Sequence, residues 1–333
     1  MLEFLTSPNW LNPQIDFVVY LQNIRMQIGP IFDDFLIWIS RFGEIEFPLI
    51  FICMIYWCFD FKSGLYLFSL NALGIFAGQF LKMTACIYRP WVLSDSIRPV
   101  EAAFKNAGGY SFPSGHSQLA ASNWGGMAFI VAKKNKILSL FLIFLILLVG
   151  FSRLYLGVHI PQDVCAGLLI GLVLIFAINA LINYCEKNKN RYLYLLCIVN
   201  ILIGLFLWYV IAKDYPIDYV NGKLLVNPHK AISNSVIYAG WISGIISGAC
   251  LCARFFPFDP NSVSKKNRAI RGIVGLILAF SILPLVQYTF DNHMRFRYAF
   301  SLIFAIGFVL TAVYPFIFTR LEGLSKVIQK SNK

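Results

Sequence analysis

Long apolar runs separated by short polar segments make up most of the chain after about residue 45. The runs cover residues 45–61, 64–82, 114–132, 137–157, 162–184, 192–212, 232–254, 269–288 and 297–318. At a rise of about 1.5 Å per residue, a helix over each run can cross a hydrocarbon core of ~30 Å, although the first run needs flanking residues to do so. The pattern therefore predicts an all-α fold, a polytopic transmembrane helical bundle of about nine spans.

Residues 1–44 are only partly apolar and follow a different pattern. One stretch has apolar positions at helical spacing opposite charged ones, namely Phe32, Phe35, Leu36 and Ile39 against Asp33, Asp34 and Arg41. This pattern is typical of an amphipathic helix that lies in the membrane interface. A short first span is the alternative, but two aspartates inside the membrane would be costly.

Composition agrees with a membrane protein. Of 333 residues, 58% are hydrophobic and 13% are charged, and the mean hydropathy is +0.68. A soluble globular protein of this length does not need so much apolar sequence. The net charge of +12 raises the possibility of nucleic-acid binding, but the cations lie in loops between apolar runs, so we exclude nucleic acid as a partner.

The distribution of cations predicts the orientation of the bundle. With nine spans, one face collects Lys62, Lys133, Lys134, Lys136, Lys187, Lys189, Arg191, Lys265, Lys266, Arg268, Arg320 and Lys326. We assign this face to the cytoplasm. The opposite face then holds residues 1–46 and the loops 83–113, 158–161, 213–231 and 289–296.

Three clusters of polar residues fall on this non-cytoplasmic side. They read Lys82-x6-Arg89-Pro90, Pro113-Ser114-Gly115-His116 and Ser152-Arg153-x5-His159-x3-Asp163. Three cations, two histidines and a carboxylate are thus gathered in a chain that is otherwise poor in charge. Such a set can hold a phosphate group and attack it.

The cations and the start of the third apolar run, at residue 114, are suited to bind an anion. Arg89 and Arg153 carry planar guanidinium groups that match pairs of phosphate oxygens, and Lys82 adds a point charge. Ser114 is suited to cap a helix, and Gly115 lets the backbone come close to a ligand at the helix N-terminus. Each of these alone could be a snorkelling side chain or a plain cap; we base the phosphate site on their combination.

The histidines supply the chemistry. His159 precedes Asp163 by four residues, and a carboxylate there can fix the tautomer so that the other ring nitrogen attacks phosphorus. His116 can protonate the departing oxygen and then accept a proton from water. The mechanism requires no cofactor. We also predict no metal site, because the eight cysteines form no CxxC pair and no carboxylate cluster is present.

The three clusters together resemble the signature motifs of the type 2 phosphatidic acid phosphatase (PAP2) superfamily, and every motif position is filled. The resemblance covers about residues 45–185, so we divide the chain into an N-terminal interfacial segment (1–44), a catalytic membrane core (45–185) and additional transmembrane helices (186–333). It implies an all-helical membrane core, a phosphohistidine intermediate and lipid phosphate or pyrophosphate substrates. It also implies that Lys82, Arg89, Ser114, Gly115 and Arg153 hold the phosphate.

Several alternatives stay open. The nine-span outline resembles the glucose-6-phosphatase branch, which takes a soluble sugar phosphate, whereas Asp163 and the YSFPSGHS stretch look more like bacterial lipid phosphatases; we favour a lipid. The phosphohistidine could instead pass its phosphate to another lipid or a glycan. The additional helices motivate a lipid transporter as a third hypothesis. The vanadate-dependent haloperoxidases have a similar site, but they are soluble.

Small residues predict close helix contacts in two runs, at Gly167-x3-Gly171 and Gly240-x3-Gly244-x3-Gly248. We expect these contacts inside the bundle, with a homo-oligomer through the glycine-rich faces as the alternative. The expected partners are otherwise membrane lipids and the lipid phosphate substrate. The expected location is the bacterial inner membrane with the site facing the periplasm, or an organelle lumen in a eukaryote.

Overall fold

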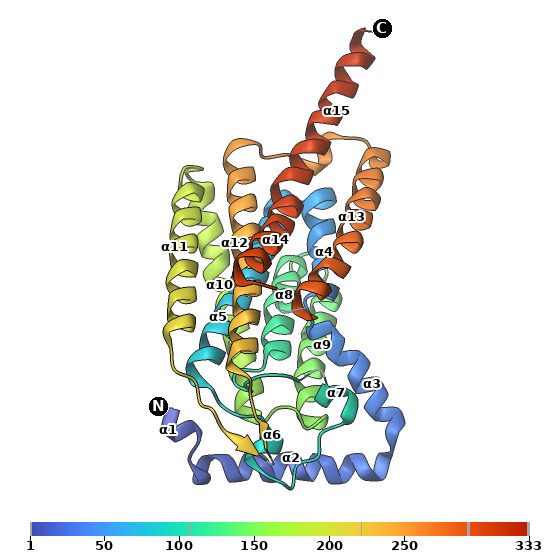
Figure 1. Cartoon of the computed structure of the whole chain (residues 1–333). Coiled ribbons are helices and arrows are strands. Elements are labelled where there is room, and N and C mark those ends of the chain that lie inside the picture. Colours follow the sequence, from blue (N-terminus) through green and yellow to red (C-terminus); the bar gives the residue numbers. More distant parts are fainter. Residues whose placement is uncertain (1, 106, 221, 292–293, 332–333) are drawn as a thin grey trace. The chain divides into compact units, whose positions relative to one another are not determined.

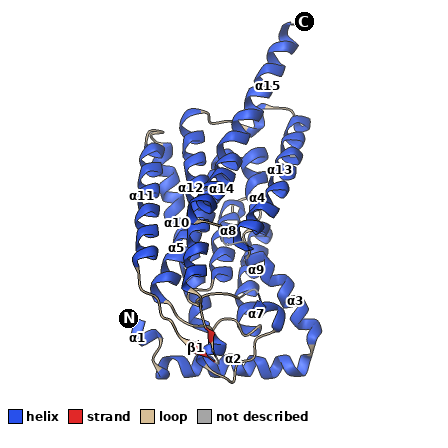
Figure 2. Cartoon of the chain, in the orientation of Figure 1, coloured by secondary structure: helices blue, strands red, loops and turns tan. Residues whose placement is uncertain are grey.

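A computed structural model of the chain describes residues 2–105, 107–220, 222–291 and 294–331. Helices make up most of it, and one short antiparallel hairpin pairs β1 (Tyr219–Val220) with β2 (Lys223–Leu224), as Figures 1 and 2 show. The helices are α1 Leu2–Leu5, α2 Pro8–Ile28, α3 Pro30–Ser40, η1 Arg41–Gly43, α4 Glu46–Met54, η2 Ile55–Phe59, α5 Phe61–Ala85, α6 Pro90–Leu93, α7 Glu101–Lys105, α8 Gly115–Val131, α9 Lys136–Tyr155, α10 Pro161–Glu186, α11 Arg191–Ala212, α12 Pro228–Phe255, η3 Pro260–Ser262, α13 Lys265–Asp291, α14 Phe296–Phe308, η4 Val309–Val313 and α15 Tyr314–Ser331.

The predicted all-α transmembrane fold is confirmed, because every apolar run falls on a helical segment. Among the described residues, seven helices are long and apolar enough to cross a membrane. An eighth is obtained if the bent pair Pro30–Gly43 and Glu46–Phe59 is one span. Helix α8 has only 17 residues, fewer than the ~20 that usually span the hydrocarbon core. The count of nine spans therefore stays a prediction.

The N-terminal segment is helical where the amphipathic pattern predicts it. Helices α2 and α3 are separated by Gly29, whose φ of 90° is in the region that favours glycine. In α3, Leu36 and Ile39 are buried while Phe35 is exposed. Because α3 and α4 are bent by 47° across their junction, both an interfacial helix and a broken first span fit the helix pattern. The position of α3 in the membrane interface stays a prediction.

The chain divides into two compact units. The first consists of Met1–Pro48, Gly74–Phe176 and Ala212–Ile232, and the second of Leu49–Leu73, Ala177–Ile211 and Ser233–Lys333. Helices α5, α10 and α12 contribute residues to both units, so neither unit corresponds to one continuous segment of sequence. The division into segments 1–44, 45–185 and 186–333 stays a prediction.

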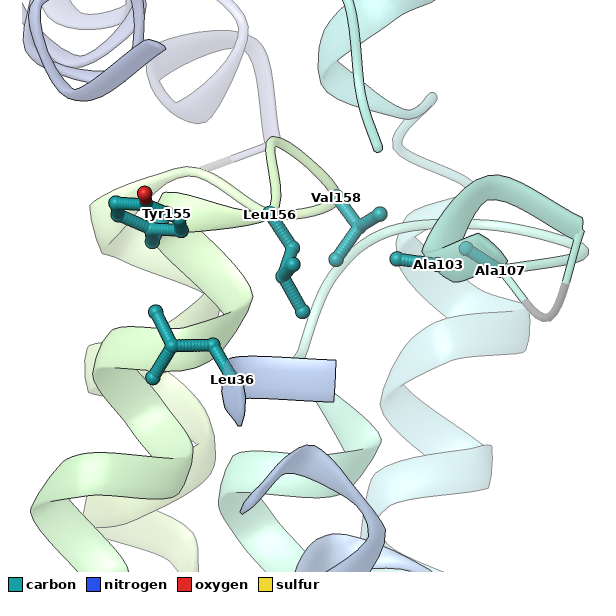
Figure 3. Packing of buried hydrophobic residues seen from close by; sticks show 6 residues of the cluster. All are labelled: Leu36, Ala103, Ala107, Tyr155, Leu156 and Val158. Atoms are coloured by element: carbon teal, nitrogen blue, oxygen red, sulfur yellow. The ribbon is translucent and has the colours of Figure 1, made fainter. Parts of the chain in front are cut away.

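The first unit is packed around α8 and α9, with α3 against α9. A buried cluster joins α3 to the C-terminal end of α9 and to α7, and Figure 3 shows its members Leu36, Ala103, Ala107, Tyr155, Leu156 and Val158. The ring of Phe32 meets Tyr155 edge-on, with 5.3 Å between the ring centroids. These contacts hold the loop between α9 and α10, which carries His159, against the N-terminal segment.

Helix α2 fixes another loop of the first unit, residues 94–100. The Gln22 side chain donates to the Ser96 carbonyl over 3.1 Å and accepts from the Arg98 backbone N–H over 2.6 Å. The Arg25 guanidinium donates to the carbonyls of Arg98 and Tyr155. The Gln22 amide and the Arg25 guanidinium therefore satisfy backbone groups of this loop.

In the second unit, the glycine stripe of α12 packs against α14, which confirms the predicted contact inside the bundle. A Cβ at Gly240 would lie 2.6 Å from the carbonyl oxygen of Phe300, and one at Gly244 would clash with the Phe304 carbonyl. Only glycine therefore allows the two backbones to come this close. A homo-oligomer through glycine-rich faces stays a prediction.

Candidate active site

The start of α8 is joined to the start of α10. Ser114 caps α8, as predicted, because its hydroxyl accepts from the Ser117 backbone N–H. The Ser114 backbone N–H in turn donates to the Asp163 carbonyl over 2.9 Å. A Cβ at Gly167 would lie 2.7 Å from the Ser114 carbonyl oxygen, so this glycine lets α10 approach the cap closely. The second and third motif clusters are thus adjacent.

His159 is buried, with its two ring nitrogens in different surroundings. Nδ1 lies 3.1 Å from Asp163 Oδ2 and 3.2 Å from the Ser111 hydroxyl. Nε2 lies 2.9 Å from a guanidinium nitrogen of Arg89. Because a guanidinium can only donate, this network assigns the proton to Nδ1 and leaves the Nε2 lone pair toward the cation.

Besides facing His159, Asp163 accepts hydrogen bonds from two groups of the surrounding loops. The Ser111 hydroxyl donates to its Oδ2 over 2.5 Å, and the Ile160 backbone N–H donates to the same oxygen over 3.3 Å. Oδ1 of Asp163 is buried and has no hydrogen-bond partner within the described part of the chain. The carboxylate is therefore fixed by one oxygen, which is the oxygen that faces His159.

The first motif cluster supplies two cations, Lys82 and Arg89, that donate hydrogen bonds to backbone carbonyls. The Arg89 guanidinium donates to the carbonyls of Gly108, Gly109 and Val158 at 2.9–3.2 Å. The Lys82 ammonium donates to the Tyr110 carbonyl over 2.9 Å. Neutral carbonyls fix the side chains but do not cancel their charge, so both cations remain able to attract an anion.

Arg153 reaches the site from the C-terminal end of α9. It is buried, and its guanidinium donates to the hydroxyl of Ser40 at the end of α3. Its Nε has no hydrogen-bond partner among the residues that the structure describes. A buried guanidinium with an unused donor is costly, which suits a group that pairs with a bound anion.

His116 lies in the first turn of α8 and is less enclosed than His159. The exposed fraction of its side chain is 24%, compared with 2% for His159. Its Nε2 lies 3.8 Å from Glu44 Oε1. A Cβ at the preceding residue, Gly115, would meet no described atom within 4 Å, so the start of α8 borders open space. A departing group can therefore reach His116 more easily than His159.

Burial holds the pKa of His159 well below its usual range, and the positive charges of Arg89, Arg153 and Lys82 act in the same direction. The imidazole is therefore neutral near pH 7. A neutral ring has the lone pair that a nucleophile needs.

The structure brings together all the residues that the sequence analysis selected for the site, and it adds three others. Ser111 joins His159 to Asp163, Ser40 holds Arg153, and Glu44 faces His116. Ser111 lies in the YSFPSGHS stretch, so its position was available as a signal. Ser40 and Glu44 lie in a segment with no motif and could not be found from spacing. No group of three or more His, Cys, Asp or Glu within the described ranges is arranged to hold a metal ion.

Comparisons with known proteins identify the family of the chain. The model of the PAP2 superfamily matches residues 63–187, and the model of a transmembrane extension of PAP2 superfamily phosphatases matches residues 236–327. The chain belongs to the PAP2 superfamily. The expected resemblance is thereby confirmed, and so is the assignment of the chain as an integral membrane protein. The three motif clusters from Lys82 to Asp163 lie within the first PAP2 match.

Three curated relatives are phosphatases by name. Phosphatidylglycerophosphatase B of Bacillus subtilis is 35% identical over 111 residues, 31% of this chain and 52% of that protein. Undecaprenyl-diphosphatase of Sulfolobus acidocaldarius is 30% identical over 110 residues, 33% of this chain and 50% of that protein. Lipid A 4'-phosphatase of Bacteroides thetaiotaomicron is 37% identical over 68 residues, 20% of this chain and 29% of that protein.

This PAP2 chain spans about half the length of the first two curated relatives and less of the third. Among solved structures, a transmembrane PAP2-type phosphatidylglycerolphosphate phosphatase from Bacillus subtilis aligns with 26% identity. The alignment covers 55% of this chain and 90% of that chain, with a TM-score of 0.46.

Proposed function

We propose that the chain is a membrane phosphatase that hydrolyses a lipid phosphate or pyrophosphate, without a metal ion, through a phosphohistidine at His159. The observation that carries the proposal is the environment of His159, with Nδ1 toward Asp163 and Nε2 toward Arg89. One nitrogen is oriented by a carboxylate, and the other faces a cation that binds phosphate oxygens. This arrangement suits an activated nucleophile beside a phosphate-binding group.

In the first step, Nε2 of His159 attacks phosphorus and the bond to the leaving oxygen breaks. His116 gives its proton to that oxygen. The Nδ1–H of His159 stays hydrogen-bonded to Asp163, whose charge stabilises the phosphorylated ring as it becomes positive. The products are the dephosphorylated alcohol, or a lipid monophosphate if the substrate is a pyrophosphate, and a phosphohistidine.

In the second step, water attacks the phosphohistidine from the side of the departed group. His116, which now lacks a proton, accepts one from the water, and the P–N bond breaks. The lone pair returns to Nε2 of His159, and inorganic phosphate leaves. The cycle thus uses His116 first as an acid and then as a base.

The phosphate oxygens are held by Lys82, Arg89 and Arg153, together with the backbone at Ser114 and Gly115 in the first turn of α8. Charge develops on these oxygens in the transition state, so fixed cations and amide dipoles lower the barrier. When phosphate binds, Arg89 exchanges its contact with Nε2 for contacts with the oxygens. The unused Nε of Arg153 supplies a further donor.

A lipid substrate is supported by the names of the three curated relatives, each of which describes a phosphatase of a lipid phosphate or pyrophosphate. The transmembrane setting of the site also favours an amphiphilic substrate, whose apolar chain can stay in the bilayer. The active face is non-cytoplasmic according to the distribution of Lys and Arg. We place the protein in the bacterial inner membrane with this face toward the periplasm.

The test is phosphate release by the purified protein in detergent, with a chelator present. The substrates are an isoprenyl pyrophosphate, phosphatidylglycerophosphate, phosphatidic acid, a sphingoid phosphate and glucose 6-phosphate, and His159→Ala is the control. We expect release from at least one lipid, at a rate that the chelator does not change and that the control lacks.

Three results would contradict parts of the proposal. Preference for glucose 6-phosphate would assign the chain to a soluble substrate. Loss of activity with the chelator would overturn the metal-independent mechanism. If all five substrates stay intact while lipid crosses the membrane, or label passes to an added acceptor lipid, the hydrolase assignment is wrong.

A further inference from the structure

The N-terminal segment forms one wall of the site, although it lies outside the residues that match the family models. The end of α3 supplies Ser40, which holds Arg153. A Cβ at Gly43 would lie 2.7 Å from the carbonyl oxygen and 2.8 Å from the Cβ of His116. The segment from Ser40 to Glu44 is therefore packed directly against the residue that protonates the leaving group.

Glu44 is the next residue after this close contact, and its carboxylate faces the ring of His116. Oε1 lies 3.8 Å from Nε2, and the exposed fractions of the two side chains are 39% and 24%. The distance is within ion-pair range but longer than the ~2.7–3.2 Å of a direct hydrogen bond. Because both side chains are partly exposed, a bridging water or a small rotation of either can join them.

The charges of the site explain why His116 needs a carboxylate. To act as an acid, His116 must carry a second proton, yet burial and the positive charges of Arg153, Arg89 and Lys82 all disfavour the protonated ring. Asp163 is already engaged by His159, Ser111 and the Ile160 backbone. The positive charges of Arg41 and Arg153 also act on Glu44 and favour its carboxylate form.

We propose that Glu44 is the positioning residue of His116, a role that rests on the proposed phosphatase function. Its carboxylate accepts the Nε2–H of His116, stabilises the imidazolium and leaves Nδ1–H directed at the departing oxygen. After transfer of that proton, the free Nδ1 accepts a proton from the attacking water. Each histidine of the site thus has its own carboxylate, Asp163 for His159 and Glu44 for His116.

This role predicts a dependence on the leaving group that a structural role would not produce. An alkyl phosphate releases a strongly basic alkoxide and needs a proton from His116. A nitrophenyl phosphate releases a stable phenolate and needs none for the first step. Loss of Glu44 should therefore slow phosphorylation of His159 by the alkyl ester and leave phosphorylation by the nitrophenyl ester almost unchanged.

The experiment compares wild type, Glu44→Gln and Glu46→Gln with decyl phosphate and with p-nitrophenyl phosphate in detergent. Glu46 is a matched control, because it is exposed and lies two residues further on, in the first turn of α4. For Glu44→Gln we expect turnover of decyl phosphate to fall by about 10-fold to 100-fold. With p-nitrophenyl phosphate we expect a burst of nitrophenolate at the wild-type rate, followed by slow turnover and accumulation of phosphohistidine. Glu46→Gln should behave as wild type.

The outcomes separate this role from the proposed function. If Glu44→Gln turns over decyl phosphate as fast as wild type, the role of Glu44 is wrong. An equal slowing of the nitrophenolate burst and of decyl phosphate turnover also overturns it, because Glu44 would then support only the shape of the site. If wild type forms no phosphohistidine with either ester, or if His159→Ala retains activity, the proposed function itself fails.

Discussion

The two units of the chain each bury charged side chains, and they do so in opposite ways. In the second unit, Arg271 of α13 forms a two-pronged ion pair with Glu322 of α15, at 3.2 Å and 2.5 Å, and donates to the Trp57 carbonyl over 2.7 Å. Its guanidinium also lies 4.0 Å from the centroid of the Phe318 ring. The guanidinium is thus paired with a carboxylate and covered by an aromatic ring.

In the first unit, the buried charges are left partly unpaired. One buried carboxylate, Asp163, shares the site with three cations: Arg89 and Arg153, which are buried, and Lys82, which is half-buried. Arg153 Nε and Asp163 Oδ1 have no hydrogen-bond partner among the described residues. A buried charge without a partner destabilises the fold, so it is retained where a ligand completes the pairing. The charges of the second unit thus form a structural ion pair, whereas those of the first unit have the character of a binding site.

Removal of the proposed nucleophile, His159, should have the largest effect on activity. We expect His159→Ala to lower phosphate release on the order of 10⁴-fold or more, because no other group can form the phosphohistidine. Phosphate release in detergent and trapping of the phosphoenzyme measure the effect. Gel filtration and circular dichroism should match wild type. Appreciable residual activity in a folded variant would contradict the mechanism.

Loss of the ion pair between Arg271 and Glu322 should lower the stability of the protein rather than its activity. We expect Arg271→Ala to lower the free energy of unfolding by about 3–5 kcal/mol, because Glu322 loses its partner. Thermal unfolding in detergent measures the change. Replacing both residues, as in Arg271→Met with Glu322→Leu, should recover most of the loss. If Arg271→Ala is as stable as wild type but inactive, the Arg271–Glu322 pair serves function, and its assignment as a structural ion pair is wrong.

The carboxylate that orients the nucleophile should matter less than the nucleophile. We expect Asp163→Asn to fold normally and to lower kcat by about 10²-fold to 10³-fold, since the amide favours the wrong tautomer of His159. Steady-state kinetics with the preferred lipid measure the loss. An unchanged rate would remove Asp163 from the mechanism.

Loss of the hydrogen bond from Ser111 to Asp163 should have a smaller effect than loss of Asp163 itself. We expect Ser111→Ala to lower kcat by about 10-fold, because Asp163 loses its shortest hydrogen bond but keeps the Ile160 N–H. Ser94→Ala, in the loop after α6, is a matched control that should leave kcat unchanged. Equal effects in the two variants would show that Ser111 has no specific role.

The smallest effect concerns pH. The pKa of His159 lies well below its usual value of about 6.5, so the ring gains a proton, and stops being a nucleophile, only in more acidic solution. We expect phosphorylation of the enzyme to proceed without loss as the pH falls from 8 through 6.5, and to decline only below that value. A burst assay with p-nitrophenyl phosphate measures this limb. A decline centred at or above pH 6.5 would contradict a buried, neutral His159.

The sequence alone predicted the helices, the family and a set of site residues that the folded chain brings together. In a membrane, no water is present to pair with the backbone N–H and C=O groups of an apolar run. A helix pairs these groups within the run, so the positions of the helices follow from local composition. The cap at Ser114 and the spacing of His159 and Asp163 also involve residues within one turn or one loop. The site residues could be selected because they lie in three short motifs in a fixed order. Their predicted roles stay predictions.

Only the tertiary structure decided which residues from distant parts of the sequence contact the motif residues. Ser40 contacts Arg153 across 113 positions of sequence, and Ser111 contacts Asp163 across 52. Glu44 reaches His116 because Gly43 lets η1 pack against α8. These contacts depend on how α3, α8 and α9 pack, and packing depends on side-chain shapes summed over many distant residues rather than on any local period. The proximity of Glu44 to His116 and of Ser40 to Arg153 therefore became visible only in the folded chain, whereas the pairing of His159 with Asp163 was predicted from their spacing.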